Sequence, residues 1–340
     1  KVNKWLEVQS ATKYLTFINM TVRILQGDCI DRLKDLEDKS IHTCITSPPY
    51  WGLRNYNDEE NQLGLENTPN EFVDNLVKVF AEVKRVLRDD GTLWLNLGDT
   101  YGRQTGSGFN ANAEEGYSVS RRKELQEKQG NIKLKTNLPK KNLLGIPWRV
   151  ALALQADGWV LRQDIIWHKP NPMPESTTDR CTKSHEYIFL LSKKSKYYYD
   201  HDAIKEDCVG KDERKWSDSY DKVGSIIQGD SNAGIKRTKR YAKDGSFKRN
   251  KRSVWTVISK PYKGAHFATF PYDLIEPCVL AGCPEGGTVL DPFGGTGTTG
   301  IVANNNNRDA ILVELNQEYV DLAKDRLRKD CGMFLDLQIS

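Results

Sequence analysis

Short apolar runs alternate with longer stretches of helical spacing along most of this chain. The runs are rich in Val, Ile, Leu and Thr and end at Gly, Asp, Glu or Pro, which is typical of buried strands. They lie at residues 22–26, 41–45, 92–97, 159–169, 288–290 and 309–313. Apolar residues at helical spacing occur at 29–36, 69–87, 146–156, 271–280 and 316–327. This alternation, with short links, predicts an α/β domain built around a parallel sheet.

Local signals predict where several elements begin, end or pair. Thr68 and Glu71 have the spacing of a capping box at the start of a helix. Asp89-Asp90-Gly91 predicts a turn before the strand at 92–97. Residues 186–192 and 197–200 are both strand-like and close in sequence, so we expect them to form a hairpin.

Two polar segments interrupt this pattern, at residues 101–142 and 201–253. The chain of 340 residues carries a net charge of only +4, but residues 101–142 hold nine Lys/Arg against four Glu, and residues 232–252 hold nine against one Asp. Positive charge is therefore concentrated on an acidic body, which favours a polyanion such as nucleic acid as partner. Solvated loops are the alternative for both segments, and a nuclear-localisation signal is a third interpretation of 232–252.

The remaining composition limits the function classes. No run of 18 apolar residues and no signal peptide is present, so we expect no membrane association. The seven cysteines contain no Cys-x-x-Cys pair, which argues for a reducing compartment and against a metal site. We expect a cytoplasmic, nucleoid-associated protein if the source is prokaryotic or viral, and a nuclear one if it is eukaryotic. Residues 1–20 are expected to be an N-terminal extension, with Met20 as a plausible native start.

The strand at 41–45 leads into Ser47-Pro48-Pro49-Tyr50. Neither proline can donate to a sheet, so the strand stops and leaves a hydroxyl and free carbonyls beside an aromatic ring. Acceptors beside a flat ring suit a nucleobase with an exocyclic amine, which would have to be flipped out of a duplex. Ser47 Oγ and the Pro48 carbonyl could hold the amine while Tyr50 stacks on the base. An ordinary Ser-Pro-Pro turn is the alternative.

A second motif follows the strand at 288–290. Gly295-x-Gly297-x-x-Gly300 matches a dinucleotide-binding loop, and Glu314 ends the next strand, where an acid can accept both hydroxyls of a ribose. The loop fits NAD and S-adenosylmethionine, or a turn that only packs a helix. Asp291 favours S-adenosylmethionine, because its carboxylate suits an ammonium group and would repel a pyrophosphate. Asp28 also ends a strand, where it could contact a ligand or cap the next helix.

Together these motifs resemble those of the amino-group DNA methyltransferases, in the subgroup whose catalytic motif precedes the cofactor motif. Thr46-Ser47-Pro48-Pro49-Tyr50 resembles the catalytic motif, and Asp291-Pro292-Phe293-x-Gly295-x-Gly297-Thr298 resembles the cofactor loop. Ala265 to Pro271 resembles the segment that closes over the methionine part of the cofactor, and Gly27-Asp28 a segment that contacts its adenine. Each motif is weak alone, but the two main ones in this order are highly specific.

The resemblance implies a Rossmann-like S-adenosylmethionine-dependent fold with a mostly parallel sheet and one reversed strand. Residues 21–200, including the basic loop 101–142, would form the catalytic half, and residues 254–340 the cofactor-binding half. Residues 201–253 would be the inserted segment that recognises the DNA target. The residues implied to bind the cofactor are Asp28, Thr46, His266, Phe267, Thr269, Asp291, Pro292, Phe293, Gly295, Gly297, Thr298 and Glu314.

In this family, Ser at the first catalytic position usually accompanies N4-cytosine methylation, and Asp accompanies N6-adenine methylation. Ser47 therefore favours cytosine N4, as does Phe270 where many adenine enzymes have Lys. N6-adenine methylation, an NAD-dependent dehydrogenase and a non-catalytic DNA-binding module remain alternatives. Double-stranded DNA is the expected partner, with a homodimer and a cognate restriction enzyme left open. The residues expected to bind DNA are Lys236, Arg237, Lys239, Arg240, Lys248, Arg249, Lys251 and Arg252.

Overall fold

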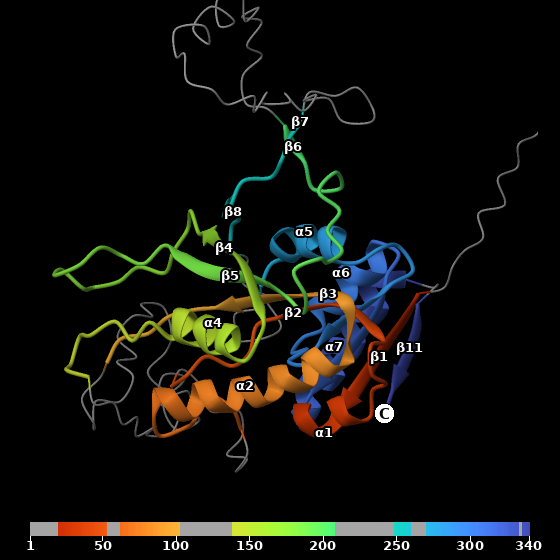
Figure 1. The fold of residues 1–340 in the computed structure, drawn as a ribbon, viewed down its shortest axis with the longest axis horizontal. Coiled ribbons are helices and arrows are strands. Elements are labelled where there is room, and N and C mark those ends of the chain that lie inside the picture. The colour runs from red at the N-terminus through yellow and green to blue at the C-terminus, as the bar shows by residue number, and fades with distance from the viewer. Residues whose placement is uncertain (1–19, 53–61, 103–137, 208–247, 260–269, 333–334) are drawn as a thin grey trace, which may run out of the picture.

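One twisted sheet crosses the molecule in the computed structural model, which describes residues 20–52, 62–102, 138–207, 248–259, 270–332 and 335–340 (Figure 1). Its nine described strands run in the order β11-β1-β10-β9-β2-β3-β5-β4-β8. The strands are β1 (Thr21–Gln26), β2 (Ile41–Thr46), β3 (Leu87–Leu97), β4 (Val160–His168), β5 (His185–Ser192), β8 (Val254–Thr256), β9 (Thr288–Asp291), β10 (Asp309–Glu314) and β11 (Asp336–Ile339). A separate antiparallel ribbon joins β6 (Glu206–Asp207) to β7 (Lys248–Arg249).

Strand direction confirms the predicted fold class. Every neighbouring pair from β11 to β3 is parallel. Strand β5 is antiparallel to both β3 and β4, and β4 is parallel to β8. Among the described strands of this sheet, β5 is therefore the single reversed one, as the resemblance implied.

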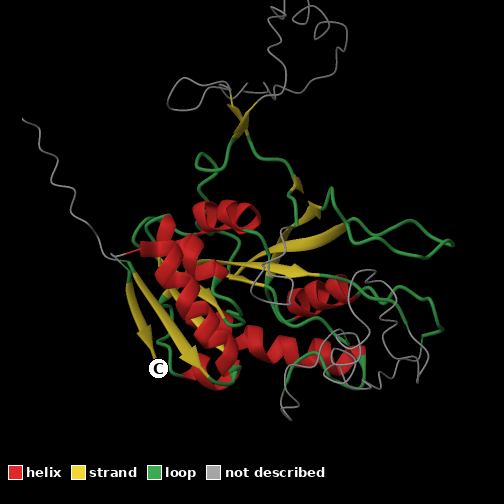
Figure 2. Ribbon diagram, turned by 180° about the vertical axis from the view of Figure 1, so that it is seen from behind, coloured by secondary structure: helices red, strands yellow, loops and turns green. Residues whose placement is uncertain are grey.

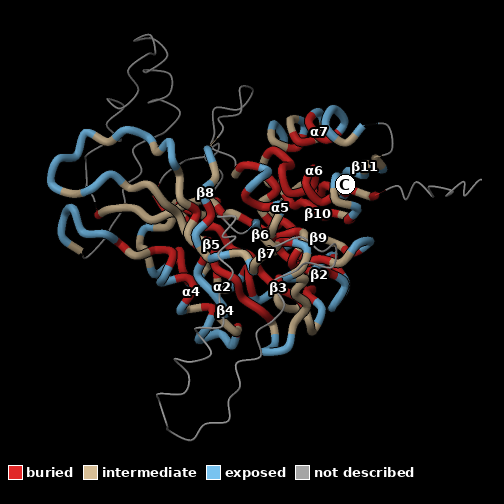
Figure 3. The backbone as a smooth tube through the Cα atoms, turned by 90° about the horizontal axis from the view of Figure 1, so that it is seen from above, coloured by how far each residue is buried: buried red, intermediate tan, exposed pale blue. Residues whose placement is uncertain are grey.

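Helices cover both faces of the sheet (Figure 2). One hydrophobic core includes apolar side chains of α1 (Cys29–Lys34), α2 (Pro69–Val86) and α4 (Ile146–Ala156). A second core includes those of α5 (Tyr272–Gly282), α6 (Thr298–Asn305) and α7 (Gln317–Cys331). Figure 3 shows the buried residues gathered along the central strands and the inner faces of these helices. Within the described ranges, no helix is both long and apolar enough to cross a bilayer.

The capping signals predicted from sequence are confirmed. Thr68 Oγ1 accepts a hydrogen bond from the Glu71 amide, and the Glu71 side chain accepts one from the Thr68 amide, so α2 starts with a complete capping box. The structure also shows a cap at the start of α7, where the Asn316 side chain accepts a hydrogen bond from the Glu318 amide.

Two local predictions are wrong, one of a turn and one of strand pairing. Residues 89–91 do not form a turn before the strand, because β3 starts at Leu87 and they lie within it, at an irregular step in its register with β2. Residues 197–200 do not pair with β5, because β3 and β4 occupy both of its edges. The amide of Tyr198 instead donates to the Asp90 carbonyl at 2.9 Å. Strand β11, which pairs in parallel with β1, was not predicted.

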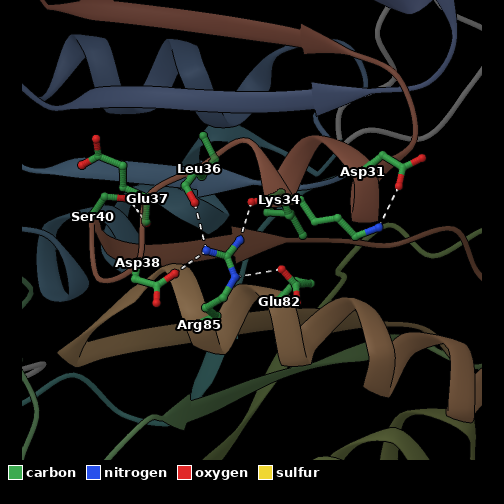
Figure 4. Close-up of polar contacts among 9 residues, drawn as sticks. Asp31, Lys34, Leu36, Glu37, Asp38, Ser40, Glu82 and Arg85 are labelled. Carbon is green, nitrogen blue, oxygen red and sulfur yellow. Dashed lines mark hydrogen bonds and ion pairs between the residues drawn. The ribbon is translucent and has the colours of Figure 1, made fainter.

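Arg85, at the end of α2, ties this helix to the segment after α1 (Figure 4). Its guanidinium donates to the carbonyls of Leu33 at 2.7 Å and Leu36 at 2.9 Å. It also pairs with Asp38 at 2.5 Å and Glu82 at 2.9 Å. Backbone carbonyls at the end of a helix lack intrahelical partners, so one planar side chain supplies donors that the helix cannot.

A buried carboxylate joins three elements at the carboxyl edge of the sheet. Asp291, at the end of β9, is 1% exposed. Its oxygens accept hydrogen bonds from the hydroxyls of Thr46 and Thr299, both at 2.6 Å, and from the Phe293 amide at 3.1 Å. Burial raises the pKa of Asp291 to about 6, and these three hydrogen bonds oppose the rise. The link fixes the end of β2 against the start of α6.

We expect Arg85→Lys to lower the free energy of unfolding by about 2 kcal/mol, because a single ammonium cannot replace the fork of charged donors. Urea denaturation followed by circular dichroism measures this change. Lys34→Met is the control, because Lys34 forms an exposed pair with Asp31 and should leave the midpoint unchanged. An Arg85→Lys midpoint equal to that of the unchanged chain would contradict the role assigned to Arg85.

Asp291→Asn tests the cost of the buried charge. The pKa of Asp291 is raised on folding, so the folded state binds the proton more tightly and loses stability as pH rises from about 4 to about 6. We expect the stability of the Asn variant relative to the unchanged chain to grow by about 3 kcal/mol between pH 4 and pH 7. The charge of Asp291 also raises the pKa of Glu314, and its removal acts in the same direction.

The measurement is urea unfolding of both proteins at several pH values. Asp325→Asn removes the same charge from an exposed position on α7, and should show no such growth. A stability difference between the Asp291→Asn variant and the unchanged chain that stays constant over this pH range would disprove the prediction.

Candidate active site

A cavity of about 410 Å³ lies at the carboxyl edge of the parallel strands. Its walls come from the segments that follow β1, β2, β9 and β10, together with the ends of β3 and β4 and the start of β5. Open α/β sheets bind ligands at this edge, where loops leave neighbouring strands. Ser47 and Asp291 both line this cavity, so the two motifs found in the sequence meet in one place.

The glycine loop between β9 and α6 forms one wall. Gly297 has φ of 80° and directly precedes α6, and a Cβ there would lie 3.1 Å from the Cβ of Ala323 on α7. A side chain is thus disfavoured by both backbone conformation and space. The Gly295 amide donates to Glu314 Oε2 at 2.8 Å, which fixes the loop against the end of β10.

Two carboxylates lie beside this loop. Glu314 Oε1 accepts a hydrogen bond from the Asn316 amide at 2.9 Å, and burial raises the pKa of Glu314. Asp28 Oδ1 accepts from the amides of Ile30 and Asp31 at 2.9 and 3.2 Å. The capping role considered for Asp28 is therefore confirmed, and its side chain still lines the cavity.

Ser47 and Tyr50 form another part of the cavity lining. The Ser47 hydroxyl lies 3.5 Å from the Tyr50 hydroxyl, which donates to Glu186 Oε2 at 2.8 Å and lies 3.2 Å from Asn96 Oδ1. The ring of Tyr50 lies so close to Gly98 that a Cβ there would be 2.5 Å from ring atom Cε2. Tyr50 is thus fixed at its hydroxyl and along its ring.

Most predicted site residues of the two motifs reach the cavity. Those lining it are Asp28, Ser47, Pro48, Pro49, Tyr50, Asp291, Pro292, Phe293, Gly295, Thr298 and Glu314. Thr46 and Gly297 do not line it: Thr46 is 1% exposed and donates to Asp291, and Gly297 packs against α7. His266, Phe267 and Thr269 lie outside the described residues.

The basic residues expected to bind DNA are described only in part. Lys236, Arg237, Lys239 and Arg240 lie outside the described residues, whereas Lys248, Arg249, Lys251 and Arg252 lie within them. Figure 1 shows β6 and β7 standing away from the main sheet. Arg249 and Arg252 both donate to Glu206 Oε1, at 2.8 and 2.6 Å, and Lys251 lies 5.0 Å from the centre of the Trp255 ring.

Sequence reasoning missed a polar cluster in the same cavity, formed by Asn96, Lys169 and Glu186 beside Trp167. Glu186 accepts hydrogen bonds from Lys169 and from Asn96. Asn96 gave a usable signal, because it is a polar residue between leucines in the mostly apolar run at 92–97. Lys169 and Glu186 gave none, since a charged residue at a strand end is ordinary.

The cavity combines the acceptors and aromatic ring of the Ser47–Tyr50 segment with the carboxylates beside the glycine loop. This arrangement suits two flat or sugar-bearing ligands held side by side. In the part of the chain that the structure describes, no group of three or more His, Cys, Asp or Glu side chains could hold a metal ion.

Comparison with known proteins identifies the family. The family described as "DNA methylase" matches residues 41–325. The Type II methyltransferase M.Cfr9I of Citrobacter freundii is 43% identical over 307 residues, which cover 90% of this chain and 87% of that protein. The Type II methyltransferase M.SmaI of Serratia marcescens is 43% identical over 308 residues, covering 90% of each.

Solved structures share the fold. A putative DNA modification methylase from Thermus thermophilus, complexed with S-adenosyl-L-methionine, superposes with a TM-score of 0.56 at 23% identity and covers 94% of this chain and 99% of that one. The cytosine-N4-specific PvuII DNA methyltransferase superposes with a TM-score of 0.57 at 18% identity, covering 90% and 87%.

These matches exclude the dehydrogenase alternative and agree with the order and the shared cavity of the two motifs. The chain belongs to the DNA methylase family of N6-adenine and N4-cytosine amino methyltransferases, which use S-adenosylmethionine as methyl donor.

Proposed function

We propose that this protein transfers a methyl group to the exocyclic N4 of a cytosine that has been flipped out of double-stranded DNA. The observation that carries the proposal is the shared cavity, which Ser47 and Pro48 line together with the glycine loop after Asp291. Tyr50, Trp167 and Phe270 also line the cavity and offer aromatic surface to a base. Base stacking on such rings contributes about 1–3 kcal/mol.

The chemistry needs orientation more than a covalent intermediate. Ser47 Oγ and the Pro48 carbonyl would accept the two N–H bonds of the amine and turn its lone pair toward the methyl group. S-adenosylmethionine would supply the methyl group: the new N–C bond would form as its methyl–sulfur bond breaks, S-adenosylhomocysteine would leave, and the surplus proton of the amine would pass to solvent. Alignment of two reactants can supply about 7–11 kcal/mol of the acceleration.

A cysteine nucleophile has no part in this proposal. Cys29 lines the cavity, but burial and the neighbouring charge of Asp28 raise the pKa of its thiol to about 12. The thiolate is the reactive form, and it is essentially absent at neutral pH.

S-adenosylmethionine would lie along the glycine loop. Glu314 and Asp28 would face its ribose and adenine, as the family motifs imply. The oxygens of Asp291 already accept three hydrogen bonds, so we assign it an electrostatic attraction for the cationic methionine part rather than a direct bond. Thr46 would act indirectly, by holding Asp291 and the backbone before Ser47.

Cytosine is favoured over adenine by two positions. Ser47 occupies the first catalytic position, where Asp accompanies most N6-adenine enzymes of the family, and Phe270 lines the cavity where many of those have Lys. N6-adenine methylation by the same geometry is the alternative function.

Residues 201–253 are proposed to recognise the DNA target, with 101–142 contacting the backbone. The described guanidinium groups of Arg249 and Arg252 share Glu206, so we expect the Lys/Arg residues between them and β6 to supply most of the charge for phosphates.

The names of the Type II relatives favour a restriction enzyme as partner, and their bacterial sources favour the prokaryotic branch of the localisation expected from sequence.

Mass spectrometry of nucleosides tests the reaction directly. Plasmid DNA incubated with the protein and S-adenosylmethionine is expected to yield N4-methyldeoxycytidine. N6-methyldeoxyadenosine would establish the alternative, and no methylated nucleoside would identify a DNA-binding module without catalysis. Sequencing of the methylated plasmid then gives the recognition sequence.

Ser47→Ala tests the catalytic motif. We expect kcat to fall by about 100-fold, because loss of one acceptor misaligns the amine. The affinity for S-adenosylmethionine, measured by calorimetry, should persist. Ser40→Ala is the matched control, because the exposed Ser40 hydroxyl contacts only a local carbonyl among the described residues. Equal loss of turnover and cofactor binding would refute the role assigned to Ser47.

A further inference from the structure

A charged pair lines the cavity together with the cofactor loop. Lys169 follows β4, Glu186 is the second residue of β5, and both line the cavity with Ser47. Lys169 Nζ pairs with Glu186 Oε1, and Glu186 Oε2 accepts from the Tyr50 hydroxyl at 2.8 Å and from Asn96 Nδ2 at 3.3 Å. The catalytic tyrosine and the ion pair are therefore one connected network.

The position of Lys169 is fixed although it is a long side chain. Its side chain is 20% exposed and that of Glu186 is 16% exposed. Its ammonium also lies 4.1 Å from the centre of the Trp167 ring, within the range of a cation–π contact. An ammonium group has three donors, and in the described structure Glu186 is the hydrogen-bond partner of one. Donors remain for a ligand in the cavity.

This inference rests on the proposed function, and it concerns how the flipped base is recognised. Beside its N4 amine, the Watson–Crick edge of cytosine carries two acceptors, N3 and O2. Adenine carries only one, N1, and then a C–H group. Ser47 and Pro48 supply acceptors for the amine, so the rest of a cytosine edge requires a donor in the same cavity.

We propose that Lys169 is the specificity-determining donor, which binds N3 and O2 of the flipped cytosine. Glu186 allows the positively charged Lys169 to stay beside the base during the reaction. The base becomes positively charged as its amine takes the methyl group, and an isolated ammonium beside it would oppose that change. The carboxylate of Glu186 offsets the charge of Lys169 and holds it toward the base.

The test combines a base analogue with a variant. Duplexes carrying the mapped recognition sequence contain either cytosine or 3-deazacytosine, which lacks the N3 acceptor, at the target position. For the unchanged protein, we expect kcat/KM to fall by about 10-fold or more with the analogue. For Lys169→Met, we expect cytosine to react more slowly and the analogue to cause little further loss. Any easier flipping of the analogue is common to both proteins and cancels in the comparison.

Two further proteins control the test. Lys193→Met removes a similarly covered lysine, 16% exposed, that donates to the Leu87 carbonyl outside the cavity, and should keep the full discrimination. Glu186→Gln leaves the donor but removes the charge, so kcat should fall while discrimination remains. Calorimetry with S-adenosylmethionine establishes that each variant is folded.

The outcomes separate this proposal from the function on which it rests. An unchanged protein that forms N4-methylcytosine but reacts equally with both duplexes would overturn the role of Lys169 without any variant. The same discrimination in Lys169→Met as in the unchanged protein would overturn it too. Absence of methyl transfer by the unchanged protein, or transfer to adenine, would instead refute the proposed function.

Discussion

The arrangement of the site depends on the buried carboxylate of Asp291. Its hydrogen bond with Thr46 joins residues 245 positions apart in the chain, and the bond from Thr299 adds the first turn of α6. A carboxylate without water must keep its donors, because each loss leaves charge unsatisfied. Since Thr46 directly precedes Ser47, the requirement that holds β9 in place also holds the Ser47 segment against the glycine loop.

Sequence predicted what depends on local pattern. Strands such as 309–313, the capping box at Thr68 and the glycine loop are encoded by residues close to one another, and the two motifs meet because parallel strands end at one edge. Which strands pair was harder to predict from sequence. Residues 197–200 are strand-like, but β5 has no free edge for them because β3 and β4 occupy both. Lys169 and Glu186 were missed because only their contact with each other in the cavity marks them as site residues, and the sequence does not show that contact.

The basic residues around β7 show why a count of Lys and Arg overstates the positive charge that a surface offers to a phosphate. Arg249 and Arg252 converge on one oxygen of Glu206, and the ammonium of Lys251 lies over the Trp255 ring. A phosphate that approached the two guanidinium groups would compete with a carboxylate already in place. In the described structure Arg249 and Arg252 thus already have a carboxylate partner at the β6–β7 ribbon, whereas the sequence alone presents them as free cations.

The reversed strand explains how Glu186 comes to lie beside Lys169 at this edge of the sheet. In a purely parallel sheet, only carboxyl ends would meet at this edge. Strand β5 runs the other way, so its amino end brings Glu186 beside Asn96 of β3 and Lys169 after β4. Three strands that pair as neighbours thus place an ion pair in the same cavity as the acceptors of Ser47 and Pro48. Acceptors and a held donor in one cavity match the polarity of a base edge that carries an amine beside ring acceptors.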